Sequence, residues 1–139
     1  MKPDPSDDEV VEQLLAQASE LGDAAGLDLC ARALELQPRN ACIWYLRSVL
    51  YNDMSLYDLA LGTILKAIAL EPDSAYFWFQ KGIIYSNVRR YDRSLRALDR
   101  ALCCDPSLEP AQSFRDFVKG NPPTRPRKQA RTANKSEPK

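Results

Sequence analysis

Apolar residues recur along the first 118 positions at the three- and four-residue spacing of helices. Val11, Leu14, Leu15 and Ala18 are an early example, because they fall on one face of a helix. Glycine, proline or short polar turns interrupt the pattern at intervals. It therefore predicts helices over residues 8–21, 24–36, 41–52, 56–70, 75–88, 91–103 and 108–119.

Two stretches of the chain repeat each other at a constant offset. Trp44 returns as Trp78, and Tyr51 returns as Tyr85. The other matched pairs are Tyr57 and Tyr91, Asp58 and Asp92, Leu61 and Leu95, Ala67 and Ala101, and Pro72 and Pro106. Leu27, Ala33 and Pro38 continue the series one period earlier. A fixed period of about 34 residues is typical of stacked repeats, and it predicts units over 8–38, 41–72 and 75–106.

The helix ends and the first unit add detail to this scheme. Asn40 and Ser74 stand where N-caps are expected. Lys119 and Gly120 suit a helix C-terminus and the left-handed position after it. The first unit is degenerate: Gly26 stands where the repeat pattern has an alanine, and we expect the internal turn to be one residue short.

Charge is divided unevenly along the chain. The total is 19 basic and 19 acidic residues, but residues 119–139 hold seven basic residues and one acid. The remainder holds twelve basic and eighteen acidic residues and has a net charge of −6. Residues 120–139 are rich in proline and almost free of apolar side chains, so we expect a disordered basic tail. It would be a solubilising extension, a weak polyanion contact or, in a eukaryote, a nuclear-import signal. Residues 1–7 are expected to be a flexible acidic N-terminus.

Composition disfavours an enzyme or a metalloprotein. There is no histidine, which is the commonest general base and metal ligand. No glycine-rich phosphate loop and no apolar run of about 20 residues is present, and no signal peptide begins the sequence. The four cysteines lack metal-ligand spacing and are expected to be small buried hydrophobic residues. These features predict a non-catalytic protein without a cofactor or metal, in a reducing, cytoplasm-like compartment.

The repeated residues resemble those of tetratricopeptide repeats, a family with aromatic, small and proline residues at set positions. The second unit matches through Trp44, Arg47, Ser48, Tyr51, Ala60, Ile64, Ala67 and Pro72. The third matches through Trp78, Lys81, Gly82, Tyr85, Ser94, Leu98, Ala101 and Pro106. The resemblance implies an all-α, right-handed superhelix, or α-solenoid, of three antiparallel helix pairs plus a seventh capping helix. This domain would span residues 8–118.

The resemblance also implies a binding surface, because the first helices of such units line a concave groove. Its residues here, called the groove set below, would be Cys42, Tyr45, Leu46, Val49, Asn52, Tyr76, Phe79, Gln80, Ile83 and Asn87. Aromatic and aliphatic side chains of this kind suit an extended apolar peptide or an amphipathic helix. Three alternatives stay open: this surface is covered by helix seven, by the basic tail, or by a second copy in a homodimer.

One ligand class of the family can be tested on the residues. Repeats that bind the C-terminal carboxylate of chaperones use lysine, asparagine and arginine at set groove positions. This chain has Glu12, Ala16, Leu46, Tyr76 and Gln80 there, and none of them is positively charged. A buried carboxylate would be left unpaired at substantial cost, so the sequence disfavours this ligand.

A cluster of basic residues offers a second candidate site. The arginine cluster consists of Arg89, Arg90, Arg93, Arg96 and Arg100. Such a cluster could hold phosphates of a nucleic acid or another polyanion. Asp92, Asp99 and Asp105 are interleaved with it, and the body of the chain is net negative. A solvated helix face carrying ion pairs three and four residues apart is therefore the favoured interpretation, and nucleic acid is disfavoured.

Overall fold

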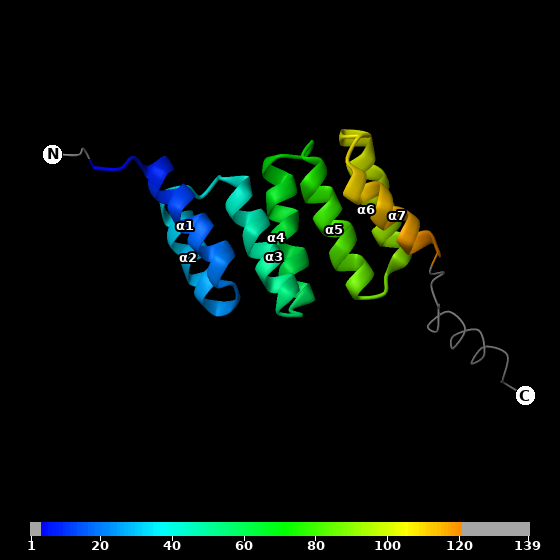
Figure 1. Ribbon diagram of the computed structural model, residues 1–139, viewed down its shortest axis with the longest axis horizontal. Helices are drawn as coiled ribbons and strands as arrows, with labels where there is room; N and C mark the ends of the chain where they lie inside the picture. Colours follow the sequence, from blue (N-terminus) through cyan, green and yellow to red (C-terminus); the bar gives the residue numbers. More distant parts are fainter. Residues whose placement is uncertain (1–3, 121–139) are drawn as a thin grey trace, which may run out of the picture.

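The computed structural model describes residues 4–120, and this part of the chain forms seven α-helices and no strand (Figure 1). They are α1 (Asp7–Leu21), α2 (Asp23–Leu36), α3 (Ala41–Asp53), α4 (Tyr57–Leu70), α5 (Ala75–Asn87), α6 (Tyr91–Cys104) and α7 (Glu109–Gly120). Every boundary lies within one residue of the predicted one. The predicted tail of residues 120–139 lies outside the described part, apart from Gly120, which belongs to α7.

The helices pack as consecutive pairs in a row. The closest contacts join α1 to α2, α3 to α4, and α5 to α6. Successive pairs meet through α2 on α3 and α4 on α5, and α6 packs on α7. Figure 1 shows the pairs following one another along the long axis, with α1 and α7 at opposite ends. The described chain is thus an all-α helical-repeat fold, as predicted.

Short turns with left-handed residues separate the two helices of each pair. Gly22, Ser55 and Arg89 have φ angles of 63°, 61° and 62° in these turns. The first turn consists of Gly22 alone, whereas residues 54–56 and 88–90 separate the other two pairs. The predicted shortening by one residue was therefore wrong, because the first turn is two residues shorter.

Hydrogen bonds at the helix starts agree with the predicted caps in part. Ser6 and Glu9 form a capping box at the start of α1. The Asn40 side chain accepts a hydrogen bond from the backbone N–H of Cys42 at 3.0 Å, as predicted for an N-cap. Ser74 occupies the N-cap position of α5, but its side chain makes no capping hydrogen bond. At the other end of the domain, Gly120 is the last residue of α7, not the residue beyond the helix, so that prediction was wrong.

Small residues allow the two helices of each pair to approach closely. The Ser48 hydroxyl donates to the Ala60 carbonyl at 2.9 Å, and the Ser94 hydroxyl donates to the Gly82 carbonyl at 2.7 Å. In the first pair, a Cβ atom on Gly26 would lie 2.7 Å from the Ala18 carbonyl oxygen. In all three pairs, small residues therefore occupy the point where the two helices come closest.

The crossings also correct the register of the first unit. Ala18 faces Gly26 as Ser48 faces Ala60, so the step from α1 to α3 is one helical turn shorter than the step from α3 to α5. Leu15 and Ser19 therefore correspond to Tyr45 and Val49. The prediction placed Glu12 and Ala16 at these positions, because it allowed for a connection only one residue shorter. Ala18 and Gly26 are in fact four residues closer in sequence than Ser48 and Ala60.

Helix α7 repeats the start of a unit but lacks a partner helix in the described residues. The indole N–H groups of Trp44 and Trp78 donate to the carbonyls of Pro38 and Pro72, at 3.2 and 2.6 Å. Gln112 lies one period after Trp78, and its side-chain amide donates to the Pro106 carbonyl in the same way. The positions that would meet a second helix are polar: Gln112, Arg115, Asp116 and Lys119. This polarity suits a capping helix.

Three apolar clusters form the core, one at each junction between units. The first joins α1 and α2 to α3, the second joins α3 and α4 to α5, and the third joins α5 and α6 to α7. All four cysteines are free thiols, but only Cys30 is buried, and Cys42 and Cys103 are exposed. The prediction of buried cysteines was wrong for these two, because they fall on outward helix faces.

Candidate functional site

The groove set occupies α3 and α5, and its members differ widely in exposure. Tyr76 is the most open aromatic member, with 56% of its surface exposed. Cys42 and Asn87, at the two ends of the set, are also exposed. The half-buried members are Tyr45, Leu46, Val49, Asn52, Phe79 and Ile83. Gln80 is only 5% exposed, so the structure places it inside the α5 packing instead of on an open surface.

Tyr45 brings the two helices of the groove set together. Its ring stacks on Phe77 of α5 with centroids 5.4 Å apart. Burial raises the pKa of the Tyr45 phenol, and the nearby Tyr76 and Cys42 raise that pKa further. Cys42, Tyr45 and Tyr76 are therefore neighbours, which ties the start of α3 to the start of α5.

Amide groups link the other end of these two helices. The Asn87 side chain donates to the Asn52 side-chain oxygen at 2.8 Å, joining α5 to α3. Gln80 behaves differently, because its Nε2 atom has no hydrogen-bond partner among residues 4–120. A buried amide without a partner costs free energy, so this position is a polar defect within the interface of the second and third units.

Two phenylalanines of α7 extend the aromatic surface, and the sequence prediction missed them. Phe79 meets Phe114 edge-to-face at 6.1 Å, and Phe114 lies 5.9 Å from Phe117. Phe117 is 60% exposed. Both lie one period beyond groove-set members, Gln80 and Ile83. The same period could have found them, but α7 was interpreted only as a cap. Helix α7 thus covers Phe79 in part and adds an open ring of its own.

One acid beside the arginine cluster pairs with a residue outside it. Asp99 of α6 forms an ion pair with Arg115 of α7. Two arginines of the cluster lie near aromatic rings: Arg93 is 5.9 Å from the Tyr85 ring and Arg100 is 5.5 Å from the Trp78 ring. A helix face with ion pairs three and four residues apart stays a prediction.

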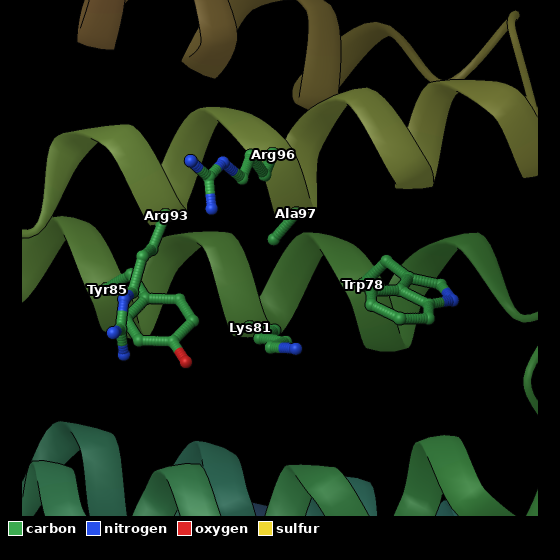
Figure 2. A pocket seen from close by; sticks show the side chains of 6 residues that line it. All are labelled: Trp78, Lys81, Tyr85, Arg93, Arg96 and Ala97. Carbon is green, nitrogen blue, oxygen red and sulfur yellow. The ribbon is translucent and has the colours of Figure 1, made fainter.

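A pocket of about 300 Å³ lies beside this cluster, on the α5 and α6 pair. Figure 2 shows Trp78, Lys81 and Tyr85 on α5, with Arg93, Arg96 and Ala97 on α6. Arg89 and Arg90, in the turn between the helices, do not line it. The structure therefore divides the predicted arginine cluster into pocket and non-pocket residues.

Other chemistry has little support in the described chain. Between residues 4 and 120, no three histidine, cysteine, aspartate or glutamate side chains come together as a metal site would need. None of the described helices is long and apolar enough to cross a bilayer. Partial desolvation of its sulfur raises the pKa of the Cys42 thiol, and the nearby Glu71 raises that pKa further, so the thiol favours its less reactive protonated form.

Comparison with known proteins places the repeat in a family. The model of the tetratricopeptide repeat matches residues 63–96, from within α4 to within α6. No curated protein matches this chain. The matched window contains Trp78, Gly82 and Tyr85, three of the residues on which the resemblance was based.

Solved structures share the fold over most of the chain. An O-GlcNAc transferase mutant from Thermobaculum terrenum is 24% identical with a TM-score of 0.74, over 84% of this chain and 23% of that one. The Arabidopsis OM64 TPR domain is 14% identical with a TM-score of 0.73, over 84% of this chain and 100% of that one.

A third structure, the first TPR of Spaghetti (RPAP3) bound to the HSP90 peptide SRMEEVD, is 13% identical. Its TM-score is 0.72, over 83% of this chain and 91% of that one. Since this chain spans less than a quarter of the transferase, nothing of that enzyme's activity follows for it. The family model thus identifies a tetratricopeptide repeat over residues 63–96, and most of the chain shares the fold of solved tetratricopeptide-repeat domains.

Proposed function

We propose that this protein is a non-catalytic adaptor that binds another protein through an apolar segment. The segment, an extended peptide or one face of an amphipathic helix, would lie across α3, α5 and α7. Tetratricopeptide-repeat domains generally mediate contacts between proteins, and repeat solenoids use an extended inner surface for this purpose. The binding surface consists of the open members of the groove set together with Phe114 and Phe117.

The observation that carries the proposal is the exposure of Tyr76 and Phe117. They are 56% and 60% exposed. Ring contacts link Phe117 to Phe79 through Phe114, and Tyr76 lies three residues before Phe79 on the same face of α5. Contiguous exposed apolar residues mark interaction sites in soluble proteins. Aromatic side chains bury large areas at a low cost in rotamer entropy, so they suit the centre of an interface.

The surface chemistry opposes a carboxylate ligand. The HSP90 peptide in the RPAP3 structure is a fact about that protein. With the corrected register, the relevant positions of this chain are Leu15, Ser19, Leu46, Tyr76 and Gln80, and none is cationic. A terminal carboxylate would lose its hydration without gaining an ion pair. An apolar ligand needs no such partner.

A random peptide library provides the test, because it requires no known partner. Peptides selected against the full chain should contain two or more aromatic or branched aliphatic residues. The double variant Tyr76→Ala/Phe117→Ala should weaken their binding by about tenfold or more, since two exposed aromatic anchors are removed. Isothermal titration measures this change.

A matched control uses exposed leucines on another helix. Leu59 and Leu65 of α4 are 52% and 44% exposed. The variant Leu59→Ala/Leu65→Ala should bind the selected peptides as the unmodified chain does. An equal loss in both variants, or a library that yields no binder, would contradict the proposal.

The homodimer alternative has its own outcome. If a second copy covers the aromatic surface, light scattering of the unmodified chain shows a dimer at the concentrations used. Tyr76→Ala/Phe117→Ala would then convert that dimer to a monomer. A monomer throughout, with peptide binding lost in this variant, supports the adaptor.

A further inference from the structure

The pocket in the third unit lies on the opposite side of α5 from the groove set. At about 100° per residue, Trp78, Lys81 and Tyr85 point about 160° away from Tyr76, Phe79 and Ile83. A ligand in this pocket would therefore leave the aromatic surface free. The pocket is a second candidate site, independent of the function proposed above.

Its lining is cationic and contains no carboxylate. Lys81, Arg93 and Arg96 contribute three positive charges, and the remaining lining residues are Trp78, Tyr85 and Ala97. The ion pair between Arg115 and Asp99 involves none of these three cations. Three cations gathered around one pocket create a strongly positive local potential.

Aromatic rings hold two of these three cations in place. The Lys81 ammonium lies 5.0 Å from the Trp78 ring centroid and 5.9 Å from that of Tyr85. The Arg93 guanidinium lies 5.9 Å from the same tyrosine ring, and Figure 2 shows the two side by side. Such contacts restrict long side chains before a ligand arrives. The entropy cost of gathering the cations around an anion is correspondingly smaller.

The second unit lacks this arrangement, although it has the same scaffold. Trp44, Arg47 and Tyr51 repeat the α5 residues, and Arg47 lies over both rings. However, Leu59 and Gly62 stand where the third unit has Arg93 and Arg96. Residues 75–106 carry six basic and three acidic residues, whereas residues 41–72 carry two and three. The cationic pocket is thus a property of the third unit and does not follow from the repeat pattern.

We propose that this pocket binds a phosphate monoester dianion carried on a phosphorylated side chain of a partner protein. Each of the two guanidinium groups can donate two parallel hydrogen bonds to phosphate oxygens, and the ammonium is a third donor group. The volume of about 300 Å³ suits one such side chain. A nucleic-acid backbone needs an extended positive track, but residues 1–118 hold twelve basic and eighteen acidic residues. The third unit would therefore recognise a single phosphate group.

Fluorescence anisotropy with the full chain provides the test. The probes are fluorescein-labelled alanine-rich peptides carrying one phosphotyrosine, one phosphoserine or the unphosphorylated residue. At least one phosphopeptide should bind about tenfold more tightly than its unphosphorylated form, because the dianion gains charge-assisted hydrogen bonds. Inorganic phosphate should compete with it. A labelled single-stranded oligonucleotide tests whether the protein binds nucleic acid instead.

Two arginine double variants with the same charge change identify the site. Arg93→Gln/Arg96→Gln should reduce phosphopeptide affinity by about tenfold, since two pocket donors are removed. Arg89→Gln/Arg90→Gln, in the adjoining turn, should change it less than about twofold, because only long-range attraction is lost. Circular dichroism confirms that both variants remain folded.

Three results would overturn the proposal. One is the absence of phosphopeptide binding at millimolar protein. Another is an equal loss of affinity in both variants, which would indicate general charge attraction. The third is tight oligonucleotide binding without discrimination between phosphorylated and unphosphorylated peptides, which would indicate a polyanion surface.

Discussion

The Ser94 hydroxyl of α6 donates a hydrogen bond to the backbone carbonyl of Gly82 in α5, at 2.7 Å. The second unit places the hydroxyl on the other helix, where Ser48 of α3 donates to Ala60 of α4. In both units one partner is a serine and the other is smaller. The crossing point thus accepts one buried hydroxyl on either helix, provided that both residues are small.

Substitutions at Ser94 separate the hydrogen bond from the packing. Ser94→Ala should lower the free energy of unfolding by about 1 kcal/mol, the usual loss for one buried hydrogen bond. Ser94→Val should lower it by about 2–3 kcal/mol, because the fully buried site has no room for a branched side chain. Urea denaturation measures both. Equal effects of the two substitutions would contradict the close approach of α5 and α6.

Two helical glycines should respond in opposite directions to alanine. A Cβ atom on Gly26 would lie 2.7 Å from the Ala18 carbonyl oxygen and 2.9 Å from Leu50, so Gly26→Ala should destabilise the fold by about 2 kcal/mol or more. A Cβ atom on Gly62 would meet nothing within 4 Å, so Gly62→Ala should stabilise α4 by about 0.5–1 kcal/mol. Thermal unfolding distinguishes the two signs. Destabilisation by Gly62→Ala would show that its face is covered.

Most of the fold could be predicted from the sequence because the repeated residues are the ones that pack. Trp44 and Trp78 recur because the indole N–H of each donates a hydrogen bond to a proline carbonyl at the end of the preceding unit. The register of the first unit was predicted incorrectly. Its shorter connection shifts α1 by one helical turn relative to α2, and this shift leaves the apolar spacing within α1 unchanged. Only the contact between Ala18 and Gly26 shows the shift.

The candidate sites were less predictable, because they depend on contacts between residues far apart in sequence. Phe114 belongs to a helix that was interpreted only as a cap, and its position beside Phe79 became evident only from the ring contact. The acids near the arginine cluster suggested local ion pairs. Asp99 instead pairs with Arg115 of α7, and this choice depends on how α7 docks.

Gln80 offers a direct measure of the cost of a buried polar group. Its Nε2 atom lacks a hydrogen-bond partner among residues 4–120, and the residue is 5% exposed. Gln80→Met keeps the length of the side chain and removes the amide. The substitution should raise the free energy of unfolding by about 1 kcal/mol. Chemical denaturation tests this, and a loss of stability would indicate that the amide is satisfied.

Alkaline pH should weaken the fold through Cys30. Burial raises the pKa of its thiol, although the nearby Arg47 lowers that pKa by a smaller amount. The thiol has a pKa of about 8.5 in the unfolded chain, while the native thiol keeps its proton to higher pH. Above that pH the unfolded state binds fewer protons than the native state, so the free energy of unfolding falls as pH rises. Below that pH the contribution of Cys30 to stability is fully retained.

Comparison with Cys30→Ala isolates this contribution. Urea midpoints measured from neutral to mildly alkaline pH should fall less steeply for the variant than for the unmodified chain. Cys42 has a pKa raised in the same direction, so the slope should decrease without disappearing. An identical slope in the two proteins would contradict the assignment to Cys30.

The central claim, that an apolar segment binds across α3, α5 and α7, is tested most directly by nuclear magnetic resonance. A selected apolar peptide would be titrated into the isotopically labelled full chain while backbone amide signals are followed. The account predicts that the largest shifts occur at Leu46, Val49, Tyr76, Ile83 and Phe117, with small shifts at Lys81 and Arg93. Shifts centred on α4 and α6 at saturating peptide would contradict it.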